Sequence, residues 1–447
     1  MTTQLFFAAT QYAAATVTAA IRAGQFGPRE GRRILVVSNV SSVPEVGTPL
    51  DKMPGFDKLR PEFDEVLSWN AFIAPHHPVG WSPRAQDTLL WQQAIRLAWN
   101  LGDDPVEIAC ESIQANPSRA VADIFADSPV TVYADGLMSY GPTRNKIPHG
   151  LSTRIKRVLH LDLVPGLKPM LLSEYGVPAE PIPNESIVKV LAEIGEAGEA
   201  VLAEQLVGIR PTAVLLGQYL SALELITQEE EEQLHVRMLR AAVKAGHRSV
   251  LFKAHPSAPS LYSESLEQAA RELGVEFTVL NSPVLAETLY AYARPKLVIG
   301  CFSTALTTAS AFFGIPVARV GTDLLLERIT PYENSNRVPL TVIDAALPDA
   351  EKVSAIGELE LSKLAAELTP LVRAVGYCMQ SKRYPALRAE TAAWLEAHLD
   401  ENQHYFKRRR LTSLRLPGGS VVRAEALRRN PTVRRAVRKI RARQAAS

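Results

Sequence analysis

The sequence predicts an α/β protein built from two Rossmann-like, doubly wound domains that face a central cleft, followed by a basic tail. Short apolar runs alternate with segments of helical spacing, which is the pattern of parallel crossover units. A stretch rich in Pro and Gly interrupts the alternation once, and the alternation then starts again. The 447 residues also exceed what one hydrophobic core accommodates, so at least two domains are expected.

The first half of the chain opens with an apolar run at 3–9, expected to be a strand, and an alanine-rich helix at 12–23. The region 41–83 is loop-like, with one possible strand at 65–69. Further strands are predicted at 33–38, Val106–Cys110 and 130–133, and further helices at 84–101 and 118–125. Continuous apolar runs of this length are typical of strands buried on both faces of a parallel sheet.

The break in the pattern lies at 146–184, which contains six prolines. We expect this stretch to connect the two domains, because linkers are commonly rich in Pro and Gly. The predicted division is therefore a first domain at 1–184, a second domain with a helical end at 185–406, and a basic tail at 407–447.

The second half repeats the alternation of strands and helices. Its predicted strands are Ala213–Leu216, Ser249–Lys253, Glu276–Leu280, Leu297–Gly300 and 317–320. Its predicted helices are 227–245, 266–273, 285–293 and 303–313. Thr227 is expected to cap the first of these helices, and the glutamates that follow it suit the positive end of the helix dipole.

Charge is distributed unevenly along the chain. The chain carries 49 basic and 47 acidic residues, yet 407–443 contains fourteen Lys and Arg and a single acid, Glu425. Each Lys or Arg near an anionic bilayer contributes about 1 kcal/mol, so an inner membrane leaflet is the first expected partner of this tail. A polyanionic glycan is the second, nucleic acid is the least favoured, and a solvated end without a partner is the alternative.

The remaining composition bears on the compartment. The three cysteines are far apart in sequence, which favours a reducing cytosol over a disulfide scaffold. The apolar N-terminal stretch lacks a basic start, and its first basic residue is Arg22, so we expect no signal peptide. These features predict a cytoplasmic protein that attaches to the membrane peripherally, if at all.

Open α/β sheets bind ligands at the carboxyl ends of their strands, and polar residues follow three predicted strands there. Asp135 and Gly136 follow the strand at 130–133. We expect Gly136 to turn the chain sharply and to leave Asp135 at the cleft as a general base. An ordinary Asp-Gly turn is the alternative.

The second and third strand ends lie in the second half. His255 follows Ser249–Lys253 and is fixed in direction by Pro256, so its imidazolium could donate to a phosphate. A histidine satisfied by a backbone carbonyl is the alternative. Ser303 and Thr304 open a helix, where free amides and hydroxyls bind anions. Ser303 could equally be a plain N-cap, and both roles can hold at once.

Two further candidates are weaker. Glu287 could accept from two ribose hydroxyls, although a glutamate on a helix surface is the more common arrangement. Gln218, which follows Gly217 at a strand end, could contact either substrate, or be a polar loop residue. No cluster of carboxylates or histidines suits a divalent metal.

The order of these motifs resembles the bacterial sialyltransferases of the two-Rossmann-domain (GT-B) type, above all their polysialyltransferase branch. That family carries an acidic-acidic-glycine motif, a His-Pro motif and a Ser-Ser/Thr motif in this order. The opening residues 5–11 and the segment 216–218 are also similar, and the resemblance covers 3–321. One departure is Ala134, which stands where the family has the first acid of the pair.

The resemblance implies a metal-independent, inverting transfer of sialic acid, or a related nonulosonic acid, from a CMP-activated donor to a glycan acceptor. The first domain would bind the acceptor and the second the nucleotide donor, with no cofactor. Asp135 would be the base, His255 would assist the departing CMP phosphate, and Ser303 and Thr304 would hold that phosphate. Extension of a capsule-like polysaccharide would be one outcome. The alternatives are a UDP-sugar transferase or epimerase, and a non-catalytic protein that binds polyanions.

Overall fold

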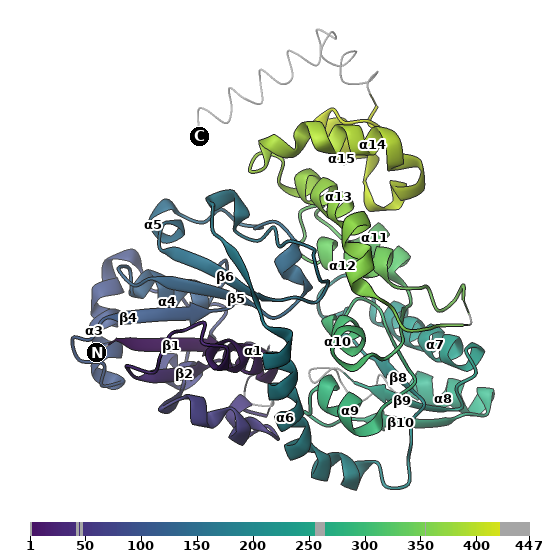
Figure 1. Ribbon diagram of the computed structural model, residues 1–447, viewed down its shortest axis with the longest axis horizontal. Helices are drawn as coiled ribbons and strands as arrows, with labels where there is room; N and C mark the ends of the chain where they lie inside the picture. Colours follow the sequence, from purple (N-terminus) through teal and green to yellow (C-terminus); the bar gives the residue numbers. More distant parts are fainter. Residues whose placement is uncertain (1, 42–43, 45–47, 255–263, 354, 421–447) are drawn as a thin grey trace.

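The computed structural model describes residues 2–41, 44, 48–254, 264–353 and 355–420. Its first sheet has seven strands in the order β3-β2-β1-β4-β5-β6-β7, and their pairings are parallel (Figure 1). The strands are β1 (Thr3–Ala8), β2 (Arg33–Val37), β3 (Glu65–Ser68), β4 (Val106–Cys110), β5 (Val130–Ala134), β6 (Ile155–Leu161) and β7 (Ala179–Ile182). The chain runs from β1 outward to β3 and then crosses to β4 on the other side of β1.

Alternate side chains of this sheet enter two separate cores, as the period of two in a strand requires. Phe6, Ala109 and Tyr133 belong to the core on the side of α1 (Gln11–Arg22). Their neighbours on the same strands, such as Phe7 and Val132, belong to the opposite core. The helices and helical turns of this half include α2 (Trp69–Ile73), α3 (Thr88–Ala98), α4 (Ser118–Ile124), η5 (Leu137–Tyr140) and α5 (His149–Ser152).

The prediction that 146–184 connects the domains is wrong, because β6 and β7 lie within it and belong to the first sheet. Pro181 lies on β7, an edge strand, where a missing amide costs no sheet hydrogen bond. The connection is instead made by α6 (Asn184–Gln205). This helix packs against α1 of the first domain and α9 (Ala286–Ala293) of the second.

The second sheet has five parallel strands in the order β10-β9-β8-β11-β12. They are β8 (Ala213–Leu216), β9 (Ser249–Lys253), β10 (Glu276–Leu280), β11 (Leu297–Gly300) and β12 (Val317–Arg319). Its helices include α7 (Gln228–Lys244), α8 (Glu264–Leu273) and α10 (Thr304–Phe313), and Thr227 caps α7 as predicted. The two Rossmann-like domains of the GT-B type predicted from the sequence are therefore confirmed.

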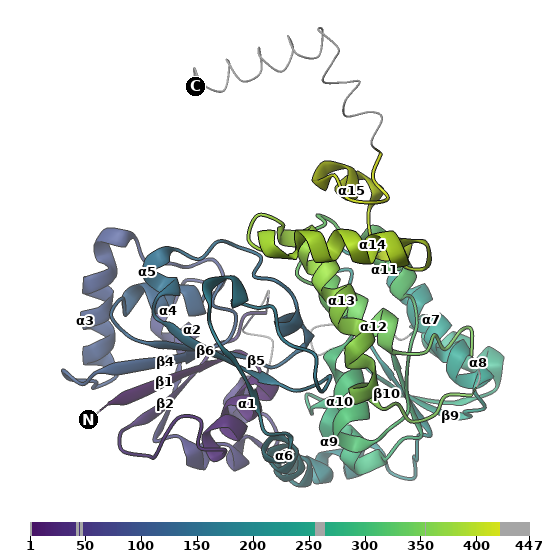
Figure 2. The ribbon, with the colours of Figure 1, turned by 45° about the horizontal axis from the view of Figure 1, so that its top comes forward.

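Helices from the end of the described chain lie on the second domain and reach the junction with the first domain in Figure 2. They are α11 (Thr322–Arg328), α12 (Arg337–Ala346), α13 (Leu361–Gln380), α14 (Arg388–Asn402) and α15 (Arg408–Leu414). The hydroxyl of Tyr384, shortly after α13, donates to the Met170 carbonyl at 2.8 Å and to Glu174 Oε2 at 2.9 Å. Met170 and Glu174 belong to the first domain, so the helical end ties the two domains together.

The first part of the predicted basic tail is folded. Leu411 of α15 is buried, and Arg410 forms an ion pair with Glu333 at 2.9 Å and donates to the Cys378 carbonyl. The boundary at 407 was therefore placed too early. Residues 421–447 lie outside the described part of the chain, so the predicted partners of the tail remain predictions. Within the described residues, no helix combines the length and the hydropathy needed to cross a bilayer.

Candidate active site

The candidate site lies where β1, β4 and β5 end side by side, next to the point at which the strand order reverses. Ligands of open α/β sheets bind at such a switch point because the loops on either side diverge there. Asp135 follows β5, Glu111 follows β4, and Ala9 leads from β1 into α1. The predicted position of Asp135 at a strand end is therefore confirmed.

The loop that carries Asp135 contacts the second domain directly. The Leu137 amide donates to Thr304 Oγ1 at 3.5 Å. A Cβ atom added at Gly136 would lie 2.9 Å from the same oxygen. The chain bends at Gly136, between β5 and η5, but its φ of −151° is extended backbone that any residue adopts, so the backbone angle alone does not require glycine. Glycine is needed here because the Thr304 side chain approaches the backbone closely.

Ser303 and Thr304 stand at the start of α10, as predicted. Ser303 caps the helix, since its hydroxyl accepts from the Ala305 amide at 3.2 Å. Thr304 directs its hydroxyl at the loop of the first domain. This arrangement puts the positive end of the α10 dipole next to the Asp135 loop, and such an end favours a bound anion.

Gln218 and Gly217 lie at the end of β8, on the second-domain side of the candidate site. The Phe302 amide donates to Gln218 Oε1 at 2.8 Å, so Gln218 holds together the ends of β8 and β11. A Cβ atom at Gly217 would lie 2.7 Å from Phe252 Cζ, so glycine allows Phe252 to pack there. Both residues position the backbone that leads into α10.

Glu287 is 5% exposed, so the alternative of a glutamate on the helix surface is wrong, and its predicted contact with a ribose stays a prediction. Thr308 Oγ1 donates to its carboxylate at 2.6 Å, and burial raises its pKa. Lys253, at the end of β9, attracts the same carboxylate and donates to the Ser282 carbonyl at 3.3 Å. Burial lowers the pKa of Lys253 to about 8. Glu287 and Lys253 are thus two buried groups that sense each other's charge.

Sequence reasoning missed Glu111. Its Oε1 accepts from the Ala9 amide at 2.7 Å. Burial, and then the negative charge of Asp135, raise the pKa of Glu111 to about 8. An available signal was an apolar strand followed by a carboxylate, the same pattern that singled out Asp135. The acid that the family motif has at 134 is absent, and a second carboxylate comes from β4 instead.

Tyr12, near the start of α1, was also missed. Its hydroxyl is buried and has no hydrogen-bond partner within the part of the chain that the structure describes. Burial raises the pKa of Tyr12, and the charges of Glu287 and Asp135 raise it further. An unpaired buried hydroxyl costs free energy, so its position close to carboxylates of both domains marks it as a group available to a ligand.

His255 and Pro256 lie outside the described residues, so their predicted roles remain untested. Among the described residues, no group of three or more His, Cys, Asp or Glu side chains is arranged to hold a metal ion.

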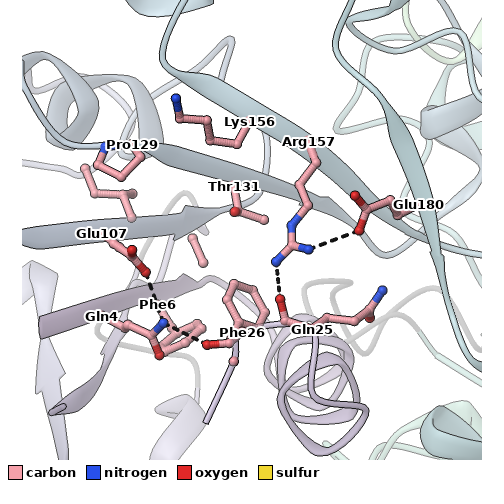
Figure 3. Close-up of a pocket in the computed structure, with 13 residues that line it drawn as sticks. Gln4, Phe6, Gln25, Phe26, Glu107, Pro129, Thr131, Lys156, Arg157 and Glu180 are labelled. Atoms are coloured by element: carbon pink, nitrogen blue, oxygen red, sulfur yellow. Dashed lines mark hydrogen bonds and ion pairs between the residues drawn. The ribbon is translucent and has the colours of Figure 1, made fainter. Parts of the chain in front are cut away.

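A pocket of about 440 Å³ opens on the α1 side of the first sheet, at the amino ends of its strands (Figure 3). Gln4, Glu107, Thr131 and Arg157 line it. Arg157 is paired with Glu180 at 3.0 Å, and Gln4 donates to Glu107 at 3.0 Å. Because the strands run between this pocket and Asp135, the two sites are at opposite ends of the sheet.

Two Rossmann-like domains, whose contact includes the Asp135 loop and the start of α10, form the arrangement of the GT-B type. The family model described as alpha-2,8-polysialyltransferase (POLYST) matches residues 4–322. The chain therefore belongs to the alpha-2,8-polysialyltransferase family, which confirms the resemblance drawn from its motifs.

Solved structures with similar folds share little sequence with this chain. The GT-B domain of a sialyltransferase from Photobacterium damselae has 14% identity and a TM-score of 0.42, over 77% of this chain and 96% of that one. A putative UDP-N-acetylglucosamine 2-epimerase from Listeria monocytogenes has 11% identity and a TM-score of 0.42, over 85% and 97%. A search of curated protein sequences finds no match. The substrate must therefore be argued from the family and from the residues of this chain.

Proposed function

We propose that this protein transfers sialic acid, or a related nonulosonic acid, from a CMP-activated donor to a hydroxyl of a glycan acceptor. The observation that carries the proposal is the contact between the Asp135 loop and Thr304. It brings the loop of Asp135, the proposed proton acceptor, next to the helix end that we propose binds the anion. Membership of the polysialyltransferase family supports the sugar that is transferred.

In the proposed reaction, Asp135 takes the proton of the acceptor hydroxyl while that oxygen attacks the anomeric carbon. A single displacement of this kind inverts the configuration at that carbon. Burial raises the pKa of Asp135, which makes its carboxylate a stronger base than a solvated one. The acceptor would therefore bind on the side of the first sheet.

The leaving group is CMP, whose phosphate gains negative charge as the bond breaks. The first amides of α10 and the hydroxyls of Ser303 and Thr304 would stabilise that charge. His255 is proposed to donate to the same phosphate. A donor with a single phosphate can be served by these groups, so we propose a reaction without a metal ion. Glu287 would face the ribose of the nucleotide.

Replacement of Asp135 by Asn tests this proposal. General bases contribute about 10²- to 10⁴-fold, so Asp135→Asn should lower transfer from CMP-sialic acid by about 1,000-fold. Asp162→Asn is the matched control, because Asp162 directly follows the neighbouring strand β6. It should keep transfer close to the unsubstituted level.

Thermal-shift measurements with CMP, CDP, UDP and GDP test which nucleotide the donor carries, independently of whether Asp135 is the base. A ligand at 100 times its dissociation constant stabilises the folded state by about 2.7 kcal/mol. CMP should stabilise both the unsubstituted protein and Asp135→Asn. Stabilisation by UDP but not by CMP would overturn the proposal that the donor is CMP-activated. Full activity of Asp135→Asn would overturn the proposal that Asp135 is the base.

A further inference from the structure

The carboxyl ends of β8 and β11 lie at the point where the strand order of the second sheet reverses. The chain runs from β8 outward to β10 and then crosses to β11 on the other side of β8. Ligands of open α/β sheets bind at such a point. Gln218 follows β8, and Phe302 follows β11 and directly precedes Ser303. A hydrogen bond between Gln218 and Phe302 joins the two strand ends there.

That hydrogen bond fixes the direction of the Gln218 side-chain amide. The Phe302 amide donates at 2.8 Å, and only the oxygen of the side chain can accept, so Oε1 faces Phe302. The nitrogen Nε2, with its two N–H groups, therefore lies on the other branch of the amide group. None of the described residues accepts a hydrogen bond from Nε2, and Gln218 is half-buried. Two oriented donors are thus left for a ligand at this point of the sheet.

Glu231, on α7, holds the loop that carries Gln218. Its side chain is 1% exposed and accepts from the Leu220 amide at 2.7 Å, the Ser221 amide at 3.0 Å and the Ser221 hydroxyl at 2.7 Å. A carboxylate accepts hydrogen bonds without donating any, which matches these three donors. The Leu220 amide also donates to the Gln218 carbonyl at 2.7 Å. The contact with Glu231 therefore reaches the backbone of Gln218 through a single residue.

We propose that Gln218 donates through Nε2 to the phosphate of the nucleotide donor, and that Glu231 is a positioning residue for Gln218. This inference rests on the proposed function, which puts that phosphate at the first amides of α10. Ser303 caps α10 and directly follows Phe302, so the Gln218 side-chain amide lies beside the same helix end. A phosphate oxygen only accepts hydrogen bonds, which suits a group that has only donors left to offer.

Gln218→Glu tests the contact with the smallest change of shape. The new side chain still accepts from the Phe302 amide, but it presents an oxygen in place of the two N–H groups. Loss of a hydrogen bond to a charged group should weaken the binding of CMP about 30-fold. Binding of cytidine, which has the same base and ribose but no phosphate, should be unchanged and would show that the fold is intact. Calorimetric titration of the full chain measures both affinities.

Gln268→Glu is the matched control, because it makes the same replacement on α8, where Gln268 is exposed. In Figure 1, α8 lies on the side of the second domain that faces away from the first. The control adds the same negative charge and should leave the affinities for CMP and cytidine unchanged. Equal weakening of CMP and cytidine by Gln218→Glu would overturn the contact with the phosphate, because cytidine has none.

A double-variant cycle tests the positioning role of Glu231. Glutamine in its place presents an NH₂ group to one of the donors, so the loop should shift and CMP binding should weaken about tenfold. In Gln218→Ala the same change at Glu231 should have no further effect, because the side chain that Glu231 positions is absent. Glu230→Gln is the control, since Glu230 accepts from the Thr227 amide at 3.0 Å instead, and it should leave CMP binding unchanged. A loss that persists in Gln218→Ala would show that Glu231 only stabilises the fold.

The same titrations separate this inference from the proposed function. If the unsubstituted protein did not bind CMP, the proposed donor would be overturned, and this inference with it. If the unsubstituted protein and Gln218→Glu bound CMP equally well, this inference alone would be overturned. A raised KM for CMP-sialic acid in that variant would then assign Gln218 to the carboxylate of the sugar.

Discussion

The two sides of the candidate site differ in the kind of charge that they hold. The first domain contributes two neighbouring carboxylates, Glu111 and Asp135, and the hydroxyl of Tyr12, which is unpaired among the described residues. The second contributes a capped helix N-terminus at Ser303 and a carboxylate next to Lys253. One side is suited to accept a proton and the other to stabilise an anion. The proposed transfer needs both at once, so we expect neither domain to be active alone.

The comparison predicts opposite effects of pH on stability. Glu111 has a raised pKa, so between its ordinary value of 4.5 and about 8 the folded state holds a proton that the unfolded chain has lost. The free energy of unfolding should therefore fall as pH rises through that window. Lys253 has a pKa lowered from 10.5 to about 8, so the folded state has lost a proton that the unfolded chain keeps. Its contribution should make the free energy of unfolding rise between pH 8 and 10.5.

Each contribution amounts to about 3 to 5 kcal/mol, at 1.4 kcal/mol for each unit of pKa shift. Glu111→Gln should remove the fall below pH 8, and Lys253→Met should remove the rise above it. Urea denaturation at pH 5, 8 and 10 measures both. Variants whose pH dependence matches the unsubstituted protein would show that these groups are not perturbed as the structure implies.

The next largest effect is expected from substitution of Gly136, which tests how closely the Asp135 loop and α10 must approach each other. In Gly136→Ala the new Cβ would lie 2.9 Å from Thr304 Oγ1 and would push the loop and the helix apart. Misplacement of reacting groups costs about 100-fold in rate, so transfer by Gly136→Ala should fall by about that factor. Thr304→Ala in the same chain removes the clashing oxygen and should restore much of that loss.

Gly150→Ala is the control for the added methyl group, since no described residue lies within 4 Å of its Cβ position. Transfer assays on the single and double variants give the coupling free energy between positions 136 and 304. Independent, additive effects would mean that the contact between the two sides does not limit the reaction.

The sequence predicted local features well and long-range ones poorly. The strands of the second domain and the cap at Thr227 were predicted because apolar runs and capping residues are local signals. Edge strand β7 was missed because it is short and contains Pro181, which resembles a linker. The helix α6 was not predicted at all, and its close contact with α9 at Gly198 and Thr288 helps explain why Glu287 is buried rather than exposed.

In the candidate site, too, local features were predicted and long-range ones were missed. Asp135 and Ser303 were found because parallel strands end at one edge, which a sequence pattern reveals. The close approach of Thr304 to Gly136 was missed because Thr304 comes 168 residues later and in another domain. Glu111 was missed because its importance comes from the order of the strands, with β4 next to β5, and that order is not visible in the sequence.

The smallest predicted effect separates helix capping from anion binding at Ser303. Removal of an N-cap hydroxyl costs about 1 kcal/mol, so Ser303→Ala and Thr227→Ala should destabilise the fold by similar amounts. Thr227 caps α7 through a capping box and is exposed away from the site, which makes it a matched control. Only Ser303→Ala should also weaken CMP binding, by about tenfold, because a hydrogen bond to a charged group is lost. Calorimetric titration with CMP measures the difference. If both variants bound CMP equally well, Ser303 would be a cap alone, and the anion-stabilising role of the second domain would rest on Thr304 and the amides of α10.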